Sequence, residues 1–247
     1  MNDDAAKGIE GTLDVVKDAD ALAVRAAEII AQKMKGCPAP FRLVLSGGST
    51  PISTYKVLSR RSDIDWACVE IFLGDERFVP PDHQDSNYRM VRETLLAGGN
   101  VQPRKLFAIP TDDTPESAAE RYDEMLRQQY GAGELEAGVP LFHLTLLGLG
   151  EDGHTASLLP GQPVLEEKTR WAAAVPQGRD EPRITLTYPA LDASQTILFL
   201  VSGAAKRDAL AQARGGQLPA GAIRPQGEVI WLADAAAADQ DDAGYGF

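Results

Sequence analysis

Short apolar runs alternate along this chain with segments long enough to form helices, and this alternation limits the folds open to it. The runs that predict strands are residues 41–45, 69–73, 106–109, 141–147, 171–175, 184–187, 197–201 and 229–232. Helical spacing and capping residues predict helices at 18–34, 52–60, 86–96, 115–130 and 204–213. Strands that are apolar on both faces and separated by helices are typical of a parallel sheet covered on both sides. We therefore expect an α/β fold: a doubly wound, mostly parallel sheet with helices on both faces.

Length and continuity indicate one domain. The chain has 247 residues, of which 44% are apolar, and this suits one large α/β domain or two small ones. We see no internal repeat and no long linker, so we expect a single domain over residues 1–247. Its last part, from about residue 238 to 247, is predicted to be a loose acidic tail.

Composition and charge limit the kinds of partner that this chain can bind. The net charge of −12 argues against nucleic acid, because phosphate backbones attract clustered lysines and arginines. No apolar run reaches the roughly 18 residues of a membrane span, and the acidic first residues do not resemble a signal peptide. Cys37 and Cys68 lie far apart and lack metal-ligand spacing, which indicates reduced thiols. We expect a cytoplasmic protein that binds neither nucleic acid nor membrane.

Polar or glycine-rich loops follow four of the predicted strands. They cover residues 46–51, 74–80, 148–157 and 202–206. Ligands of open parallel sheets bind outside the carboxyl ends of the strands. We therefore expect the four loops to converge on one site.

The first loop is typical of a phosphate site. Gly47 and Gly48, after Ser46, allow backbone N–H groups to turn toward an anion, and Ser49 and Thr50 add hydroxyl donors at a helix start. The ending Gly-Lys-[Ser/Thr] of a Walker A loop is absent. The alternative is a plain capped turn between a strand and a helix.

Three cations elsewhere fit an anionic ligand. Lys206 is predicted in the first turn of a helix, where the helix dipole disfavours a cation unless an anion is bound beside it. Arg183 precedes the predicted strand at 184–187, and Arg179 lies in a turn before it. Each of the three is alternatively an ordinary solvated side chain.

The second loop carries three consecutive charges, beginning at Asp75. In a pocket at the strand ends, Asp75 could hold substrate hydroxyls and Arg77 could stabilise a developing oxyanion. The alternative is a solvated loop.

The third loop is the most informative. Gly148, Gly150 and Gly153 match the spacing Gly-x-Gly-x-x-Gly of dinucleotide-binding folds, but carboxylates at 151 and 152 would lie beside a bound pyrophosphate. An imidazole at His154 and a carboxylate at Asp152, on a tight turn, fit a general base better.

The other histidines fit other roles. His143 lies within a predicted strand, as a core or interface residue does, and His83 lies in a polar run that predicts exposure. Neither the cysteines nor the histidines have zinc-site spacing, and no Gly-x-Ser-x-Gly elbow occurs, which disfavours a serine hydrolase.

These loops occur in an order that resembles one known family. The matching segments are LSGGSTP at 45–51, GDERFVP at 74–80, SNYRM at 86–90, GLGEDGHTASLLPG at 148–161 and RITLT at 183–187. Together they resemble the glucosamine-6-phosphate isomerase/6-phosphogluconolactonase family, and within it the lactonases. The resemblance extends from about Ala19 to Trp231. The related deaminases continue after the histidine with Ile-Ala-Phe-Asn-Glu-Pro, where this chain has residues 155–160, and read Asp-Glu-Tyr at 75–77.

The resemblance implies a reaction and a site. It implies hydrolysis of 6-phospho-D-glucono-1,5-lactone to 6-phosphogluconate, the second step of the oxidative pentose phosphate pathway. His154 would activate water, Asp152 would orient the imidazole, and Arg77 or loop N–H groups would stabilise the oxyanion. The phosphate would lie on residues 46–50 with Lys206 and Arg183. No cofactor and no metal is implied.

Three alternatives remain open at this point. They are a deaminase/isomerase of the same fold, a non-catalytic sugar-phosphate sensor, and a nicotinamide-dependent dehydrogenase. A sensor that regulates transcription needs a helix-turn-helix and a basic face, and neither is visible here. We expect a small-molecule partner, a sugar-phosphate lactone, and a monomer or weak homo-oligomer.

Overall fold

The structure, a computed structural model, describes residues 11–36, 40–177 and 179–239. Most of the predicted tail, residues 240–247, and Cys37 lie outside these ranges. Residues 235–239 form turns after the last strand.

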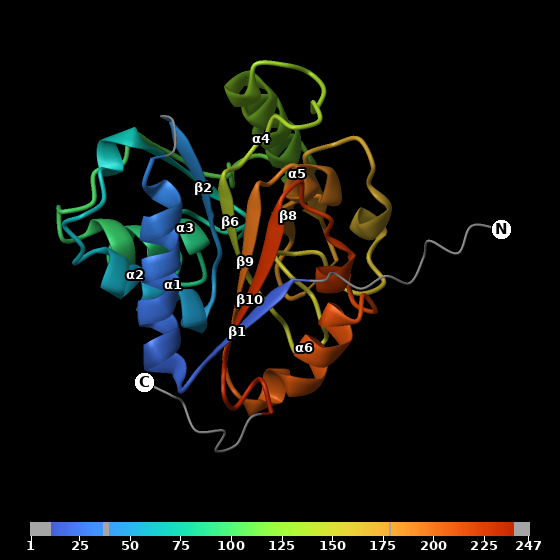
Figure 1. The fold of residues 1–247 in the computed structure, drawn as a ribbon. Coiled ribbons are helices and arrows are strands. Elements are labelled where there is room, and N and C mark those ends of the chain that lie inside the picture. Colours follow the sequence, from blue (N-terminus) through green and yellow to red (C-terminus); the bar gives the residue numbers. More distant parts are fainter. Residues whose placement is uncertain (1–10, 37–39, 178, 240–247) are drawn as a thin grey trace.

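The centre of the molecule is a seven-stranded parallel sheet (Figure 1). Its strand order is β1-β10-β9-β6-β2-β3-β5. The strands are β1 (Thr12–Val16), β2 (Phe41–Leu45), β3 (Val69–Leu73), β5 (Lys105–Phe107), β6 (Leu144–Gly148), β9 (Thr196–Val201) and β10 (Glu228–Asp234). Every pairing within it is parallel, as the alternation predicted.

Helices cover the sheet from both sides. They are α1 (Ala19–Met34), α2 (Ser49–Leu58), α3 (Asn87–Val91), α4 (Pro115–Tyr130), α5 (Tyr188–Asp192) and α6 (Arg207–Arg214). Figure 1 shows α1 and α2 on one side of the sheet and α6 on the other. The predicted doubly wound α/β fold is therefore confirmed. Within the described residues, no helix is both long and apolar enough to cross a membrane.

Local chemistry explains several helix ends. Asp18 caps α1 by accepting a hydrogen bond from the Ala21 N–H (2.9 Å), and Thr114 caps α4 by accepting from the Ser117 N–H (3.2 Å). Gly131 ends α4 in the left-handed conformation, with φ of 90°. α2 begins at Ser49, three residues before the predicted start, because a proline is tolerated in the first turn of a helix.

Two other predicted helices differ from the prediction in their first or last turns. The predicted helix at 204–213 starts as a 3₁₀ turn, Ala204–Lys206, and α6 proper begins at Arg207. The predicted helix at 86–96 is capped by Ser86 and comprises α3 followed by a π-helical turn, Arg92–Leu96.

A second, three-stranded antiparallel sheet was not predicted. It has the order β4-β8-β7, with β4 (Asp75–Arg77), β7 (Ala172–Val175) and β8 (Arg183–Leu186). The runs at 171–175 and 184–187 were expected in the parallel sheet, and residues 75–77 were expected in a loop. The connection from β7 to β8 is too short for a parallel crossover, which needs a dozen or more residues, so the two strands pair antiparallel.

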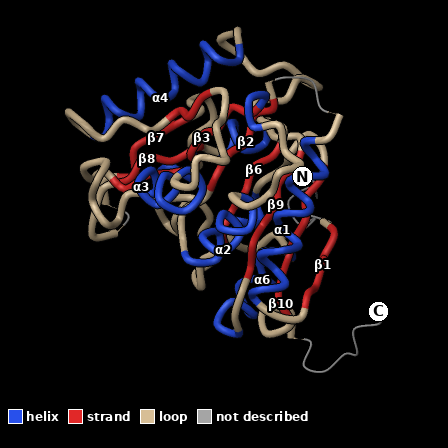
Figure 2. Tube along the Cα trace, turned by 90° about the vertical axis from the view of Figure 1, so that its left-hand side faces the viewer, coloured by secondary structure: helices blue, strands red, loops and turns tan. Residues whose placement is uncertain are grey.

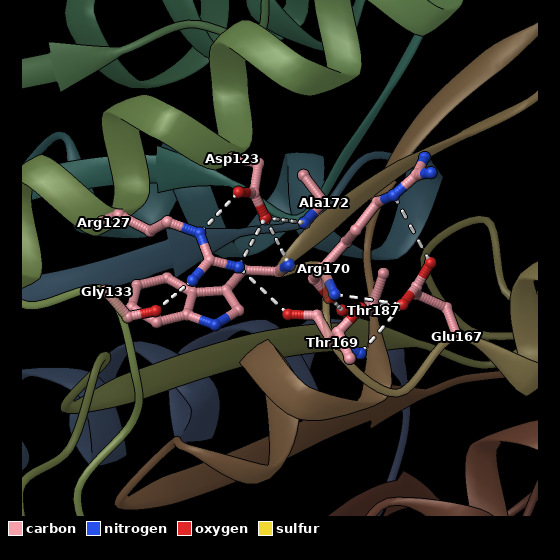
Figure 3. A network of polar contacts seen from close by, with 9 residues as sticks. Asp123, Arg127, Gly133, Glu167, Thr169, Arg170, Ala172 and Thr187 are labelled. Carbon is pink, nitrogen blue, oxygen red and sulfur yellow. Dashed lines mark hydrogen bonds and ion pairs between the residues drawn. The ribbon is translucent and has the colours of Figure 1, made fainter.

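Helix α4 holds this second sheet in place (Figures 2 and 3). In Figure 2, β7 and β8 run beside α4. Asp123 of α4 accepts a hydrogen bond from the N–H of Trp171 (2.5 Å), directly before β7, and forms an ion pair with Arg127 (2.6 Å). The Arg127 guanidinium also donates to the Thr169 carbonyl (3.0 Å) and lies 4.5 Å from the centre of the Trp171 ring. β8, which follows β7, is thereby fixed over the carboxyl edge of the main sheet.

Candidate active site

The four polar loops meet in one pocket at the carboxyl edge of the main sheet, as the sequence predicted. The pocket draws on the segments after β2, β3, β6 and β9 and on β8. Every site residue predicted from the sequence lines it, except Asp152, which is bound to His154 instead. Those lining residues are Ser46, Gly47, Gly48, Ser49, Thr50, Asp75, Arg77, His154, Arg183 and Lys206.

Contacts with Tyr55 and Asn87 fix the loop that follows β2. The Ser46 N–H donates to the Tyr55 hydroxyl (3.0 Å), and that hydroxyl donates to the Ser46 carbonyl (2.7 Å). Gly48 has a φ of 107°, which favours glycine, and leads into the first turn of α2. A β-carbon on Gly47 would lie 2.1 Å from Asn87 Oδ1. A glycine is therefore required where the loop passes this asparagine.

Two arginines and a lysine bring positive charge to the pocket. Arg183 extends from β8, and its Nε is buried with no hydrogen-bond partner among the described residues. Burial lowers the pKa of the Arg183 guanidinium, and the nearby charge of Asp75 partly opposes this shift. Lys206 Nζ lies 3.9 Å from Glu151 Oε1, too far for a strong ion pair. These groups are therefore suited to an anionic ligand.

Asn87, which the sequence analysis did not select, organises the second loop. Its side-chain amide donates to Asp75 Oδ1 (3.2 Å) and accepts from Arg77 Nη1 (2.8 Å). The other oxygen of Asp75 accepts from the Ser157 hydroxyl (2.6 Å). One asparagine thus orients both the Asp75 carboxylate and the Arg77 guanidinium of the pocket. The signal for it was its place directly after the helix cap Ser86, within a segment the resemblance already used.

Glu76 anchors the same region from the protein interior. It is 1% exposed, and its carboxylate accepts from the backbone N–H groups of Arg77 (2.8 Å), Asn87 (2.7 Å) and Tyr88 (2.7 Å). Burial raises the pKa of Glu76, and these three hydrogen bonds oppose the shift. The carboxylate therefore ties β4 to the start of α3.

Asp152 and His154 form a dyad on the loop after β6. His154 Nδ1 lies 2.5 Å from Asp152 Oδ1, and the His154 N–H also donates to that oxygen (3.2 Å). This contact favours the tautomer with the proton on Nδ1, which leaves Nε2 as the basic atom. Burial raises the pKa of Asp152, but hydrogen bonds from His154 and the charges of His154 and Arg179 outweigh it, so the pKa lies below its usual value.

A tight backbone turn carries the dyad. The Gly150 N–H donates to the His154 carbonyl (2.8 Å), and the Gly153 N–H donates to the Gly150 carbonyl (3.0 Å). Gly153 has a φ of 78° and packs against Leu218, which a β-carbon there would approach to 2.4 Å. The glycines that resembled a dinucleotide motif therefore serve a compact turn that presents an imidazole.

The three remaining predictions have clear outcomes. Arg77 and Arg183 line the pocket, whereas Arg179 contacts the dyad from outside it. His143 is half-buried, accepts from the Arg42 N–H (3.0 Å) and has its pKa lowered by burial, as a core histidine does. His83 is exposed, as expected. Among the described residues, no group of three or more histidine, cysteine or acidic side chains is placed to hold a metal ion.

Fold and pocket define a doubly wound α/β protein with a cationic site and a histidine–aspartate dyad at the carboxyl edge of its sheet. The chain belongs to the family described as glucosamine-6-phosphate isomerases/6-phosphogluconolactonase, whose model matches residues 17–231.

Named relatives agree with this membership. A 6-phosphogluconolactonase of Nostoc sp. is 37% identical over 235 residues, which cover 92% of this chain and 96% of the relative. A 6-phosphogluconolactonase of Synechocystis sp. is 39% identical over 217 residues, 85% of this chain and 86% of the relative. The crystal structure of 6-phosphogluconolactonase from Thermotoga maritima has a TM-score of 0.78 at 28% identity and covers 90% of this chain and 99% of its own.

Proposed function

We propose that this chain hydrolyses 6-phospho-D-glucono-1,5-lactone to 6-phosphogluconate, the second step of the oxidative pentose phosphate pathway. The observation that carries the proposal is the dyad of Asp152 and His154, whose imidazole lines the same pocket as the cations Arg183 and Lys206. A base next to an anion site suits a lactone that carries a phosphate. The relatives named for this activity support the same substrate.

The chemistry uses the free nitrogen of the imidazole. His154 Nε2 removes a proton from water, and the resulting hydroxide attacks the lactone carbonyl carbon. The oxyanion that forms is stabilised by Arg77 or by loop N–H groups. Collapse of this intermediate breaks the bond between the carbonyl carbon and the ring oxygen, and the imidazolium returns its proton to that oxygen. Asp152 keeps the imidazole oriented through both proton transfers.

The remainder of the pocket binds the substrate. The phosphate lies against residues 46–50, where glycines and hydroxyls line the pocket beside the start of α2, with Lys206 and Arg183 adding charge. Asp75, held by Asn87 and Ser157, accepts from hydroxyls of the sugar.

The chain acts as a single domain, as a monomer or weak homo-oligomer, and in the cytoplasm. Its partner is a sugar-phosphate lactone and not a nucleic acid. A lactone needs only a base and charge stabilisation for hydrolysis, so the proposed reaction requires neither metal nor organic cofactor.

A deaminase/isomerase reaction fits the pocket less well. Ring opening and isomerisation need a further acid/base group, which the related deaminases have as the glutamate of Ile-Ala-Phe-Asn-Glu-Pro; this chain has Leu159 at that position. The hydroxyl groups nearby belong to Thr155 and Ser157, and the Ser157 hydroxyl is already bound to Asp75 (2.6 Å).

The test is hydrolysis of the phosphorylated lactone at near-neutral pH, corrected for its spontaneous hydrolysis. Unphosphorylated glucono-1,5-lactone is the control, and we expect much slower turnover of it because it lacks the group that Lys206 and Arg183 bind. Equal rates on both lactones would contradict the phosphate site. Ammonia release from glucosamine 6-phosphate would instead identify a deaminase.

A further inference from the structure

Arg179 lies outside the pocket but contacts both members of the dyad. It belongs to the turn between β7 and β8, and its Nη2 lies 2.9 Å from Asp152 Oδ2 and 3.3 Å from His154 Nδ1. The other oxygen of Asp152 is taken by His154 (2.5 Å). Both oxygens of the carboxylate are therefore engaged, one by the imidazole and one by the guanidinium.

The two contacts of Arg179 have opposite effects on the imidazole. With its proton on Nδ1, His154 donates to Asp152, so the 3.3 Å approach of Nη2 to Nδ1 sets two donors against each other. Uptake of a second proton at Nε2 creates an imidazolium, which Asp152 attracts and Arg179 repels. The cation therefore partly cancels the carboxylate's preference for the protonated ring.

Other charges face the same imidazole. Asp75, Arg77, Arg183 and Lys206 line the pocket, and Glu151 precedes Asp152 with its carboxylate 3.9 Å from Lys206 Nζ. Among the described residues, however, no cation other than Arg179 makes a hydrogen bond or ion pair with either member of the dyad. Removing Arg179 thus changes the charge next to the dyad and leaves the pocket charges in place.

We propose that Arg179 is a positioning residue, which holds Asp152 against His154 and keeps the imidazole available as a base at lower pH. The proposal rests on the proposed lactonase function. Arg179 also makes the imidazolium a stronger acid once the water proton has been taken up, which favours its return to the ring oxygen. The side chain is 45% exposed, so its influence is partly screened by water and salt.

The test compares titration of the histidines in the wild-type protein and in Arg179→Gln by NMR, at low salt and without substrate. The chain has three histidines, so the His154 signal is identified by its loss in His154→Gln. We expect the midpoint of this signal to move up by about 0.5 pH units in Arg179→Gln, the size expected for removal of a nearby, water-screened charge. The acid limb of kcat/KM should move by the same amount, and Arg179→Lys should restore both.

Arg121→Gln is the matched control. It removes the same charge from another exposed arginine–aspartate pair, Arg121 with Asp112 (2.8 Å), on α4. We expect no shift in this variant. An unchanged midpoint in Arg179→Gln would overturn the proposal, and so would a rise in KM with the acid limb unmoved. The titration is measured without substrate, so this outcome is distinct from failure of the protein to hydrolyse the lactone.

Discussion

Arg77 lies directly opposite Arg183 where β4 pairs with β8. Residues opposite each other on an antiparallel pair have neighbouring side chains, and like charges in this arrangement are destabilising. Both side chains line the pocket, where Asp75 supplies a carboxylate that offsets part of their repulsion. A bound dianion would offset the rest. The pairing of β4 with β8 in the second sheet thus holds two cations near each other at the edge of the main sheet.

Replacing Arg183 should separate binding from stability. We expect Arg183→Met to raise the KM for the phosphorylated lactone at least tenfold, since it removes a cation whose Nε lacks a protein partner within the described residues. Stability should be unchanged or higher by about 1 kcal/mol, because an apolar side chain replaces a buried, incompletely paired charge. Steady-state kinetics and urea unfolding measure the two effects. Arg214→Met, which removes another buried Nε on α6, is the control and should leave KM unchanged. A wild-type KM in Arg183→Met would exclude this arginine from the binding site.

Anions should stabilise the free protein. Inorganic phosphate is expected to raise the melting temperature, because it binds the folded pocket and not the unfolded chain; at about 100 times Kd the gain is roughly 2.7 kcal/mol. Lys206→Ala should weaken this response, since it removes a pocket cation. Thermal unfolding at constant ionic strength, with chloride as the comparison salt, measures it. Equal responses to phosphate in the wild-type protein and the variant would contradict a role for Lys206.

A methyl group added at Gly150 should displace the side chains of the Asp152–His154 dyad. A β-carbon on Gly150 would lie 2.0 Å from His154 Nδ1 and 2.6 Å from Asp152 Oδ1. We expect Gly150→Ala to lower kcat by about 100-fold, because small misplacements of catalytic groups are this costly. Gly98→Ala is the control, since nothing lies within 4 Å of a β-carbon at that position. Full activity of Gly150→Ala would show that the dyad does not need its present geometry.

Removal of the base and of its orienting carboxylate should both reduce turnover. His154→Gln is expected to lower kcat by about 10²- to 10⁴-fold, the usual contribution of a general base. Asp152→Asn should lower kcat on the order of 100-fold with little change in KM, because an amide N–H facing Nδ1 favours the tautomer with its proton on Nε2. Initial rates, corrected for spontaneous hydrolysis, measure both. An almost fully active His154→Gln would exclude this histidine as the base.

Asp192, remote from the pocket, should make stability depend on pH. Burial raises its pKa to about 6, against about 3.9 in an unfolded chain. Its contribution to stability is therefore present below about pH 4 and is lost as pH rises through 6. Relative to Asp192→Asn, which keeps an acceptor for the Arg224 N–H (2.6 Å), the wild-type protein should lose about 2 kcal/mol between pH 4 and 7. Urea unfolding at both pH values tests this, with Asp82→Asn, at an exposed carboxylate, as the control. Parallel pH profiles for the wild-type protein and Asp192→Asn would contradict it.

Local signals in the sequence predicted the parts of the fold that local chemistry determines. The helix at 115–130 was predicted at its observed bounds, because Thr114, Pro115 and Gly131 mark its ends. The convergence of four loops followed from a general rule for parallel sheets, which needs no knowledge of side-chain packing.

The elements that were missed depend on distant partners. β4 has the sequence Asp-Glu-Arg, which has no strand pattern, and it becomes a strand by pairing with β8, more than a hundred residues later. β1, unpredicted at the start of the chain, is likewise defined by its pairing with β10. Asn87 gains its place in the pocket because α3 brings it against Gly47 and Arg77. No periodicity in the sequence encodes these contacts.

The pairing of β1 with β10 also governs how the chain can fold while it is being synthesised. β1 is at the edge of the sheet, and its neighbour β10 begins at Glu228. The first described strand to leave the ribosome can therefore pair only after the last one has been synthesised. β10 joins β9 on its other side, and until it emerges the apolar edge of β9 stays open. Such an edge can pair with other chains. A nascent chain that stalls before residue 228 therefore keeps this edge of β9 open and is prone to aggregate.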